Sequence, residues 1–308
     1  MLGLPIAPPQ ASTTAWQVDA LALFMLLVSL LIAGGIFLSI VVFCVKYRRR
    51  PGNDIGQPAK RTAPLEITWT LVPMALAAVP FVWGAQIYLS EARPPADALE
   101  IYVVAKQWMW KAEHPTGQSE IDALHVPVGR AVKLTMTSQD VIHSFYVPAF
   151  RVKTDVLPGR YTTLWFQATE AGDYRLFCSQ YCGTDHARMI GQLTAMTPGD
   201  YAAWLTSGST ATDSPAAQGR KLFLQNGCVA CHETGLAPNL QGVFGQPVIL
   251  SDGSTIVADE SYIREHILTP GRKVVYGYQP IMPSFAGRLT EDDLVQLLAY
   301  IKSIGSSP

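Results

Sequence analysis

Two long runs without a charged residue dominate the first ninety positions of the chain. The first extends from Ala20 to Val45 and the second from Ile67 to Leu89. A helix needs about 20 apolar residues to cross a hydrocarbon core ~30 Å thick, so each run is long enough to span a membrane. The sequence therefore predicts a transmembrane helical hairpin over residues 20–90.

Charged residues around the two runs indicate how this hairpin is oriented. The stretch between the runs is strongly basic, and its charged residues are Lys46, Arg48, Arg49, Arg50, Asp54, Lys60, Arg61 and Glu66. Because basic loops stay in the cytoplasm, both chain ends are expected outside, with residues 1–19 as an extracytoplasmic N-terminal segment. A cleaved signal peptide would have a shorter apolar core placed after its positive charges, so a retained first helix is favoured. Processing of a short tail before Trp16 stays open.

Beyond the second run the sequence changes to short stretches that are typical of β-strands. They alternate apolar and polar residues, are separated by Gly, Pro and Asp, and lie at 99–110, 131–137, 160–167, 173–178 and 190–196. Short alternating strands at such spacing predict an all-β sandwich or barrel, which we place at residues 91–205.

A stretch of small polar residues at 206–215 has the composition of a linker and divides the β region from the rest. Residues 216–308 are predicted to be helical, with helices at 216–226, 260–268 and 290–304. The last of these begins with Thr290 as a helix cap and acidic residues in its first turn. The formal net charge of −1 gives no indication of a nucleic-acid partner.

The densest group of metal-binding side chains lies near the end of the β region. Its members are Cys178, Cys182, His186 and Met189 in CSQYCGTDHARM, with His143 upstream in VIHSFYVPAF. A blue-copper site uses two histidines, one thiolate and a weak methionine, and this group adds a second thiolate. Two thiolates on one loop can bridge two copper ions, so that each ion keeps one histidine. Met189 and the backbone carbonyl of Gln180 would then take the weak axial positions.

Three other interpretations of this group stay open. Cys178 and Cys182 could form a disulfide in an oxidising compartment. The same two cysteines could bind zinc together with His186, although zinc does not require a thioether ligand. Met189 could be a core residue, as methionine often is.

A second cofactor motif, CVACH, extends from Cys228 through Cys231 to His232. This is the attachment pattern of a c-type haem, in which two thiols bind the haem and the histidine takes the iron from one side. A redox disulfide or half of a zinc site is the alternative for an isolated CxxC. Met282, in GYQPIMPSF, is the best-placed sixth ligand. His266 is its rival, but it lies inside a predicted helix.

Longer sequence phrases carry a resemblance to a known family. Residues 65–196 resemble subunit II of the haem–copper cytochrome oxidases in LEITWTLVP, KQWMW, QDVIHSFYVPAFRVKTDVLPGR and CSQYCGTDHARM. Residues 216–305 resemble a class I cytochrome c. The order of membrane hairpin, β domain, linker and cytochrome c domain resembles subunit II of the caa-type cytochrome c oxidases over nearly the full chain.

The resemblance implies a fold and a set of site residues. The implied β fold is a cupredoxin-like Greek-key barrel with a dinuclear CuA centre, held by His143, Cys178, the carbonyl of Gln180, Cys182, His186 and Met189. One covalently bound haem c would use His232 and Met282 as its axial ligands. Trp108 corresponds to a family tryptophan that helps electrons enter the copper, and Glu66 to the mouth of a proton path. Without the resemblance, Trp108 reads as a packing aromatic and Glu66 as an acidic residue at a helix start.

Position 180 departs from the family pattern. Most members carry glutamate where this chain has Gln180. The carbonyl ligand survives this change, whereas the carboxylate that the family uses for a magnesium site at the boundary with subunit I is lost.

The implied function is electron entry into a respiratory cytochrome c oxidase. Electrons from an external cytochrome c or another donor would pass through haem c and CuA to subunit I, where oxygen is reduced to water with proton pumping. Subunit III is a further expected partner. The implied location is the plasma membrane of a bacterium, with both outer domains on the periplasmic side. A CuA-containing subunit of a nitric-oxide reductase and a stand-alone membrane-anchored carrier are the alternatives.

Overall fold

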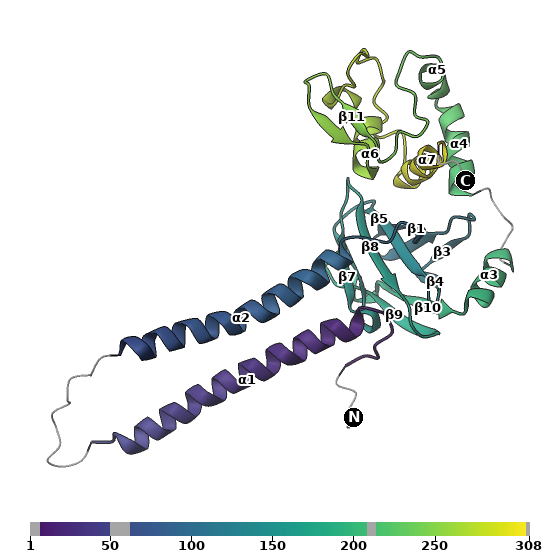
Figure 1. The fold of residues 1–308 in the computed structure, drawn as a ribbon. Helices are drawn as coiled ribbons and strands as arrows, with labels where there is room; N and C mark the ends of the chain where they lie inside the picture. Colours follow the sequence, from purple (N-terminus) through teal and green to yellow (C-terminus); the bar gives the residue numbers. More distant parts are fainter. Residues whose placement is uncertain (1–6, 50–61, 208–213, 306–308) are drawn as a thin grey trace. The chain divides into compact units, whose positions relative to one another are not determined.

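The computed structural model describes residues 7–49, 62–207 and 214–305 (Figure 1). Residues 14–93 form one compact unit, and residues 1–13 together with 94–308 form a second. Much of the predicted basic loop, with Arg50, Lys60 and Arg61, lies outside the described residues. So does most of the predicted linker.

The first unit is a hairpin of two long helices, α1 at Ala15–Lys46 and α2 at Ala63–Glu91. At 1.5 Å per residue these helices extend for about 48 and 44 Å, which exceeds the ~30 Å hydrocarbon core. Their most apolar windows have mean hydropathies of 2.8 and 1.6, and no residue of either window is buried. The rings of Phe24 and Trp83 lie 6.3 Å apart between the two helices. The chain is therefore anchored in a membrane by lipid-facing apolar side chains.

Ten strands form the β domain, here residues 94–207. Their bounds are β1 Leu99–Lys106, β2 Met109–Glu113, β3 Ser119–Ile121, β4 Ala123–Pro127, β5 Ala131–Ser138, β6 His143–Val147, β7 Val152–Val156, β8 Thr162–Gln167, β9 Gly172–Cys178 and β10 Ile190–Met196. They pair into two five-stranded sheets, with orders β3-β2-β1-β5-β8 and β4-β10-β9-β6-β7. The predicted cupredoxin-like all-β domain is confirmed, and its barrel takes the form of a two-sheet sandwich.

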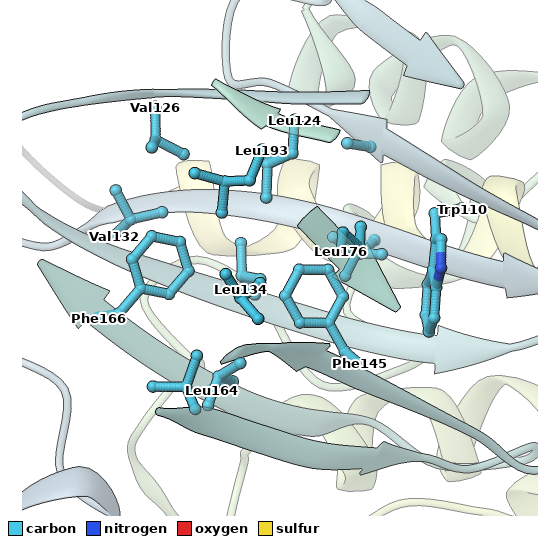
Figure 2. Packing of buried hydrophobic residues seen from close by; sticks show 14 of the residues in the cluster. Trp110, Leu124, Val126, Val132, Leu134, Phe145, Leu164, Phe166, Leu176 and Leu193 are labelled. Atoms are coloured by element: carbon cyan, nitrogen blue, oxygen red, sulfur yellow. The ribbon is translucent and has the colours of Figure 1, made fainter. Parts of the chain in front are cut away.

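A single apolar core fills the space between the two sheets. Figure 2 shows the rings of Phe145 and Phe166 beside Leu134 and Leu176, with Trp110 at one end of the row. Residues alternate along β1, so Ile101 and its second neighbours face this core and the residues between them face outward. The two faces of β1 consequently have different partners.

The N-terminal segment also contributes to the β domain. Ala11 is fully buried in the core, and Ser12 forms a β-bridge with Ala168. The backbone N–H of Ala11 donates to the Ala149 carbonyl at 2.9 Å, and the Ser12 hydroxyl donates to the Phe150 carbonyl at 2.8 Å. Ala11 and Ser12 are thus part of the sandwich, which the sequence did not reveal.

The predicted strand at 99–110 is wrong in one respect, because the chain reverses within it. Strands β1 and β2 pair antiparallel with Lys106 opposite Met109, so Gln107 and Trp108 form a two-residue turn. The polar residues Lys106 and Gln107 at the reversal are followed at once by Trp108 and two further apolar residues. The pattern alone therefore reads as one long strand.

Helices build the C-terminal domain, here residues 214–305, which follows helix α3 at Pro198–Ser207. Its elements are α4 Pro215–Gln225, α5 Val229–His232, β11 Pro247–Ile249, β12 Thr255–Val257, α6 Glu260–Leu268 and α7 Glu291–Ser303. The hairpin of β11 and β12 was not predicted. Each of its strands has three residues, too few to show a period.

Two local features fix the position of α7. Thr290 and Asp293 form a capping box at its start, as the predicted cap requires. Gly219 lets α4 cross α7 closely, because a Cβ at this position would lie 1.9 Å from the Gln296 carbonyl oxygen. No other residue could occupy position 219 without moving the two helices apart.

Candidate copper and haem sites

The copper-type donors come from two places on one sheet. His143 is the first residue of β6, and Cys178 is the last residue of β9. Cys182 and His186 lie on the loop that follows β9, and Met189 immediately precedes β10. Because β6 and β9 are neighbours in the sheet, their ends bring His143 next to this loop.

The donor atoms of this group converge. The two sulfurs, Cys178 Sγ and Cys182 Sγ, are 3.7 Å apart. Cys178 Sγ lies 4.0 Å from His143 Nδ1, and Cys182 Sγ lies 3.5 Å from His186 Nδ1. Each thiol therefore has its own imidazole.

Two weaker donors complete the group, one beside each thiol. The carbonyl oxygen of Gln180 is 3.2 Å from Cys178 Sγ, and the thioether sulfur of Met189 is 3.9 Å from Cys182 Sγ. The Met189 side chain is 1% exposed and lies on the core side of the group. A zinc site does not need such a thioether ligand. All six predicted donors are thus together, and the soft set of two thiolates, two imidazoles and a thioether suits copper.

The two thiols of the pair differ in acidity. Burial raises the pKa of Cys178, but the hydrogen-bonded His143 ring and neighbouring backbone groups outweigh this effect and bring it to about 6. Burial and the adjacent Cys178 raise the pKa of Cys182. At neutral pH the metal-free pair thus retains one proton, which a bound metal would displace.

Asp140 orients one of the imidazoles and was not identified from the sequence. His143 Nε2 donates to Asp140 Oδ1 at 2.8 Å, which leaves Nδ1 facing the sulfurs. The backbone N–H of Gln107 donates to the other carboxylate oxygen of Asp140 at 2.7 Å. The only sequence signal was a carboxylate three residues before a candidate ligand, a spacing that is common without function.

Trp108 lies against the copper loop, as the resemblance implies. Its indole Nε1 donates to the Cys182 carbonyl at 3.2 Å, and the Gln107 side chain donates to the same carbonyl at 2.8 Å. Gly183 makes this contact possible: its φ is +118°, and a Cβ there would lie 3.2 Å from Trp108 Cζ2. Trp110 is also near the site, edge-on to the His143 ring at 6.0 Å.

The haem motif lies on the short helix α5 and the loop after it. His232 Nδ1 donates to the Pro238 carbonyl at 2.8 Å, so its Nε2 is left for an iron. A cavity of about 160 Å³ is lined by Cys228, Cys231, His232 and Met282. Two thiols and an imidazole on the wall of a largely apolar cavity fit a covalently attached haem.

His266, the rival sixth ligand, lines the same cavity. It lies on α6, and its Nδ1 is buried without a hydrogen-bond partner among the described residues. Burial and the neighbouring His232 lower its pKa. Both Met282 and His266 therefore remain predicted candidates for the iron.

Glu66 belongs to the helical hairpin, whereas the copper and haem residues belong to the other compact unit. It lies in the first turn of α2, where its carboxylate accepts a hydrogen bond from the Thr62 hydroxyl at 2.5 Å. About 38 Å of helix separate it from Glu91 at the other end of α2. Its predicted role at the mouth of a proton path needs another subunit and stays a prediction.

The two sites define a membrane-anchored protein whose outer part is built to hold copper and haem c. The family of the cytochrome c oxidase subunit II periplasmic domain matches residues 83–195, and the cytochrome c family matches residues 216–305. The chain belongs to the cytochrome c oxidase subunit II family and carries a fused cytochrome c domain.

Similar proteins cover most of the chain. Cytochrome c oxidase subunit 2 of Alkalihalophilus pseudofirmus is 29% identical over 96% of this chain and 89% of that protein. The subunit 2 of Thermostichus vulcanus is 28% identical over 68% of this chain and 80% of that protein. The crystal structure of the periplasmic domain of subunit II from Bradyrhizobium japonicum is 31% identical, covering 38% of this chain and 96% of that one, with a TM-score of 0.36.

Proposed function

We propose that this chain is the electron-entry subunit of a respiratory haem–copper oxidase. Its C-terminal domain accepts electrons from an external cytochrome c or a similar donor, and its β domain passes them to subunit I. There oxygen is reduced to water and protons are pumped. Copper and haem c supply the redox chemistry when bound, and the residues of the chain hold and orient them.

The convergence of six donor groups on one sheet edge carries this proposal. Cys178 and Cys182 are close enough for each sulfur to contact two copper ions, and each thiol has one imidazole and one weak donor beside it. Such a set favours a dinuclear centre over a single blue-copper site, which needs only one thiolate. Buried, rigid ligands also limit rearrangement when the charge of the centre changes.

The chain's own residues perform three tasks at this centre. Asp140 holds the His143 ring by its Nε2, and the core side of the site excludes water through Met189. Trp108 covers the loop and donates to the Cys182 carbonyl, which makes it the proposed point of electron entry to the copper.

Glu66 is proposed to lie at the proton path of subunit I.

Metal analysis of the purified protein tests the dinuclear proposal. We expect two copper ions and one haem per chain, because the two ligand sets share no residue. A single copper ion per haem, with an ordinary blue-copper spectrum, would contradict it.

A chain that ends at Ser207 should keep both copper ions and lose fast turnover at low donor concentration. Unchanged turnover would show that the C-terminal domain is not the main entry.

Haem ligation is tested separately by two variants. M282A should abolish the methionine–iron absorption band and lower the haem potential, since methionine ligation raises it. H266A should leave both unchanged. A wild type without the methionine–iron band, whose haem potential changes in H266A and not in M282A, would assign the iron to His266.

A further inference from the structure

The C-terminal domain meets the β domain through a cluster of buried apolar residues, here the docking cluster. Its β-domain members lie on the outward face of β1 and before β8, and its other members lie on α6 and α7. The main residues are Tyr102, Val104, Tyr161, Tyr262, Ile263, Val295, Leu298 and Ile301. Burial of this outward face explains why β1 is apolar on both sides, unlike a strand with one solvated face.

Four charged side chains, here the charge square, flank the docking cluster. The β domain contributes Glu100 and Lys133, which are directly opposite each other on β1 and β5. The C-terminal domain contributes Glu260 from α6 and Lys302 from α7. Each domain thus presents one acidic and one basic residue.

Opposite charges alternate around the square. Lys302 Nζ is 2.7 Å from Glu100 Oε1 and 2.9 Å from Glu260 Oε1. Lys133 Nζ is 3.1 Å from each of the same two oxygens. The side chains are only 14–25% exposed, so water screens them less than it screens surface pairs.

Further contacts fix the same pose at two other points. Arg264 donates from Nη1 to the Gly159 carbonyl at 2.6 Å and also pairs with Glu291. Lys111 on β2 lies 3.0 Å from Asp292 at the start of α7. The apolar cluster supplies the buried area, whereas the charges specify one orientation, because a rotated domain would place like charges together.

The docked pose connects the haem cavity with the copper loop. Ile263 and Ile301 line a neighbouring cavity that shares His232 and Met282 with the haem cavity, and both belong to the docking cluster with Val104. Trp108, which contacts the Cys182 carbonyl, follows Val104 by four residues. Four extended residues span at most about 14 Å, so β1 leads from the interface to the copper loop over a short distance.

We propose that the outer face of the β3-β2-β1-β5-β8 sheet is the electron-transfer docking site for the chain's own cytochrome c domain. Glu100, Lys133, Glu260 and Lys302 are the positioning residues that hold the domain there. One electron leaves the haem, which is oxidised, and the copper centre gains it; no proton or other reactant takes part. The proposal rests on the function proposed above.

Charge reversal within each domain provides the test. The double variants E100K/K133E and E260K/K302E each keep the net charge and keep an opposite pair inside their own domain. Both place like charges across the interface. The quadruple variant restores alternation around the whole square. E265K/K273E reverses a half-buried pair elsewhere on the C-terminal domain and is the matched control.

Two independent readouts are measured on the purified oxidase complex. Hydroxyl-radical footprinting of Tyr102 and Tyr161 reports docking, since both rings are buried in the docking cluster. Haem-to-copper electron transfer after rapid photoreduction of the haem reports function. Absorption spectra confirm that both cofactors are bound in every variant.

We expect each double variant to increase labelling of both tyrosines and to slow electron transfer about tenfold, the equivalent of ~1.4 kcal/mol. The quadruple variant and the control should match the wild type. Glu260 and Lys302 lie near helix ends, so reversing their charges also changes their interaction with the helix dipoles. The E260K/K302E variant and the quadruple variant share this change, so it cannot explain a recovery in the quadruple variant. If Tyr102 and Tyr161 stay protected in both double variants, the four charged residues do not position the domain. Increased labelling with wild-type transfer would overturn the electron path. If the wild type itself transfers no electron, the proposed function fails, while footprinting still decides the docking.

Discussion

The copper site and the haem cavity differ in how completely the protein chain forms them. At the copper site the donors Cys178, Cys182, His143 and Met189 are at most 8% exposed and lie within about 4 Å of a neighbouring donor. In the C-terminal domain a cavity of about 160 Å³ separates the thiols from the rest of the wall. Leu236 and Ile281 on this wall are 59% and 57% exposed.

This difference follows from what each cofactor contributes. The proposed copper centre would add only two small ions to a sandwich that already has its own core between two sheets. Haem is a large apolar body and acts as a core residue of the domain that holds it. We therefore expect the β domain to fold without metal, and the C-terminal domain to depend on haem.

The largest expected effect is the loss of the C-terminal fold when haem cannot bind. An unfilled cavity of about 160 Å³ would destabilise the domain by ~4 kcal/mol at ~24 cal/mol per Å³. A loss of this size is close to the lower end of a typical domain stability of about 5–15 kcal/mol. C228S/C231S/H232A should remove haem and melt α4 to α7, while copper content stays normal. Circular dichroism measures the loss of helix, and metal analysis measures the copper content. A folded, haem-free C-terminal domain would remove the contrast between the two regions.

The second effect is a loss of copper without a loss of fold. C182S removes one of the two sulfurs proposed to bridge the copper ions and should reduce the copper content from two ions to one or none. Because serine is close to cysteine in size, the β domain should lose only ~1–2 kcal/mol. Optical spectra and thermal melting measure the two quantities, and C44S, a change in α1, is the control. If C182S unfolds the β domain, the copper site is as structural as the haem.

The third effect concerns pH at the interface that joins the two regions. Burial opposes ionisation of Glu100, but Lys302 and Lys133 outweigh it and hold its pKa at about 2, and the pKa of Glu260 is also lowered. Both carboxylates therefore stabilise docking above their ordinary pKa of ~4.5, and this contribution is lost as the pH falls from there towards 2.

E100Q should thus weaken docking at pH 7 by roughly 1–3 kcal/mol and make it less sensitive to acid. Footprinting of Tyr102 across this pH range measures the change, with haem and copper spectra as controls. An acid response of E100Q equal to that of the wild type would show that Glu100 is not the responsible group.

The smallest effect is expected at position 180. Copper would use the backbone oxygen of Gln180, which lies 3.2 Å from Cys178 Sγ, so Q180E should leave the copper spectrum unchanged. A carboxylate is a better ligand than an amide for a hard divalent cation. Growth on manganese followed by paramagnetic resonance should therefore show stronger manganese retention in Q180E than in the wild type. Tight manganese bound by the Gln180 side chain of the wild type would contradict this expectation.

Sites whose residues are close in sequence were predictable. The copper loop and the CVACH motif each place several donors within a few residues, so spacing alone indicated their chemistry. His143 is 35 residues from Cys178, and it was included as the second histidine that such a copper site requires, although no short spacing connects it with the loop. Helices with clear caps and periodicity, such as α6 and α7, were also predicted to within a residue or two.

Features that depend on distant pairs were not predictable. Glu100, Lys133, Glu260 and Lys302 have no pattern in the sequence, because only the docked pose brings them together. The contact of Trp108 with Gly183 and the burial of Ala11 likewise join segments far apart in the chain. The linker composition predicted two separate domains and gave no sign of the docking cluster between them.

Rapid photoreduction of the haem in the full-length protein tests the central claim most directly. The haem and copper absorption bands are followed together over a series of protein concentrations. We predict that the haem is reoxidised at the rate at which copper is reduced, and that this rate does not depend on protein concentration. A rate that rises in proportion to concentration, or a haem that stays reduced beside oxidised copper, would contradict electron transfer within the chain.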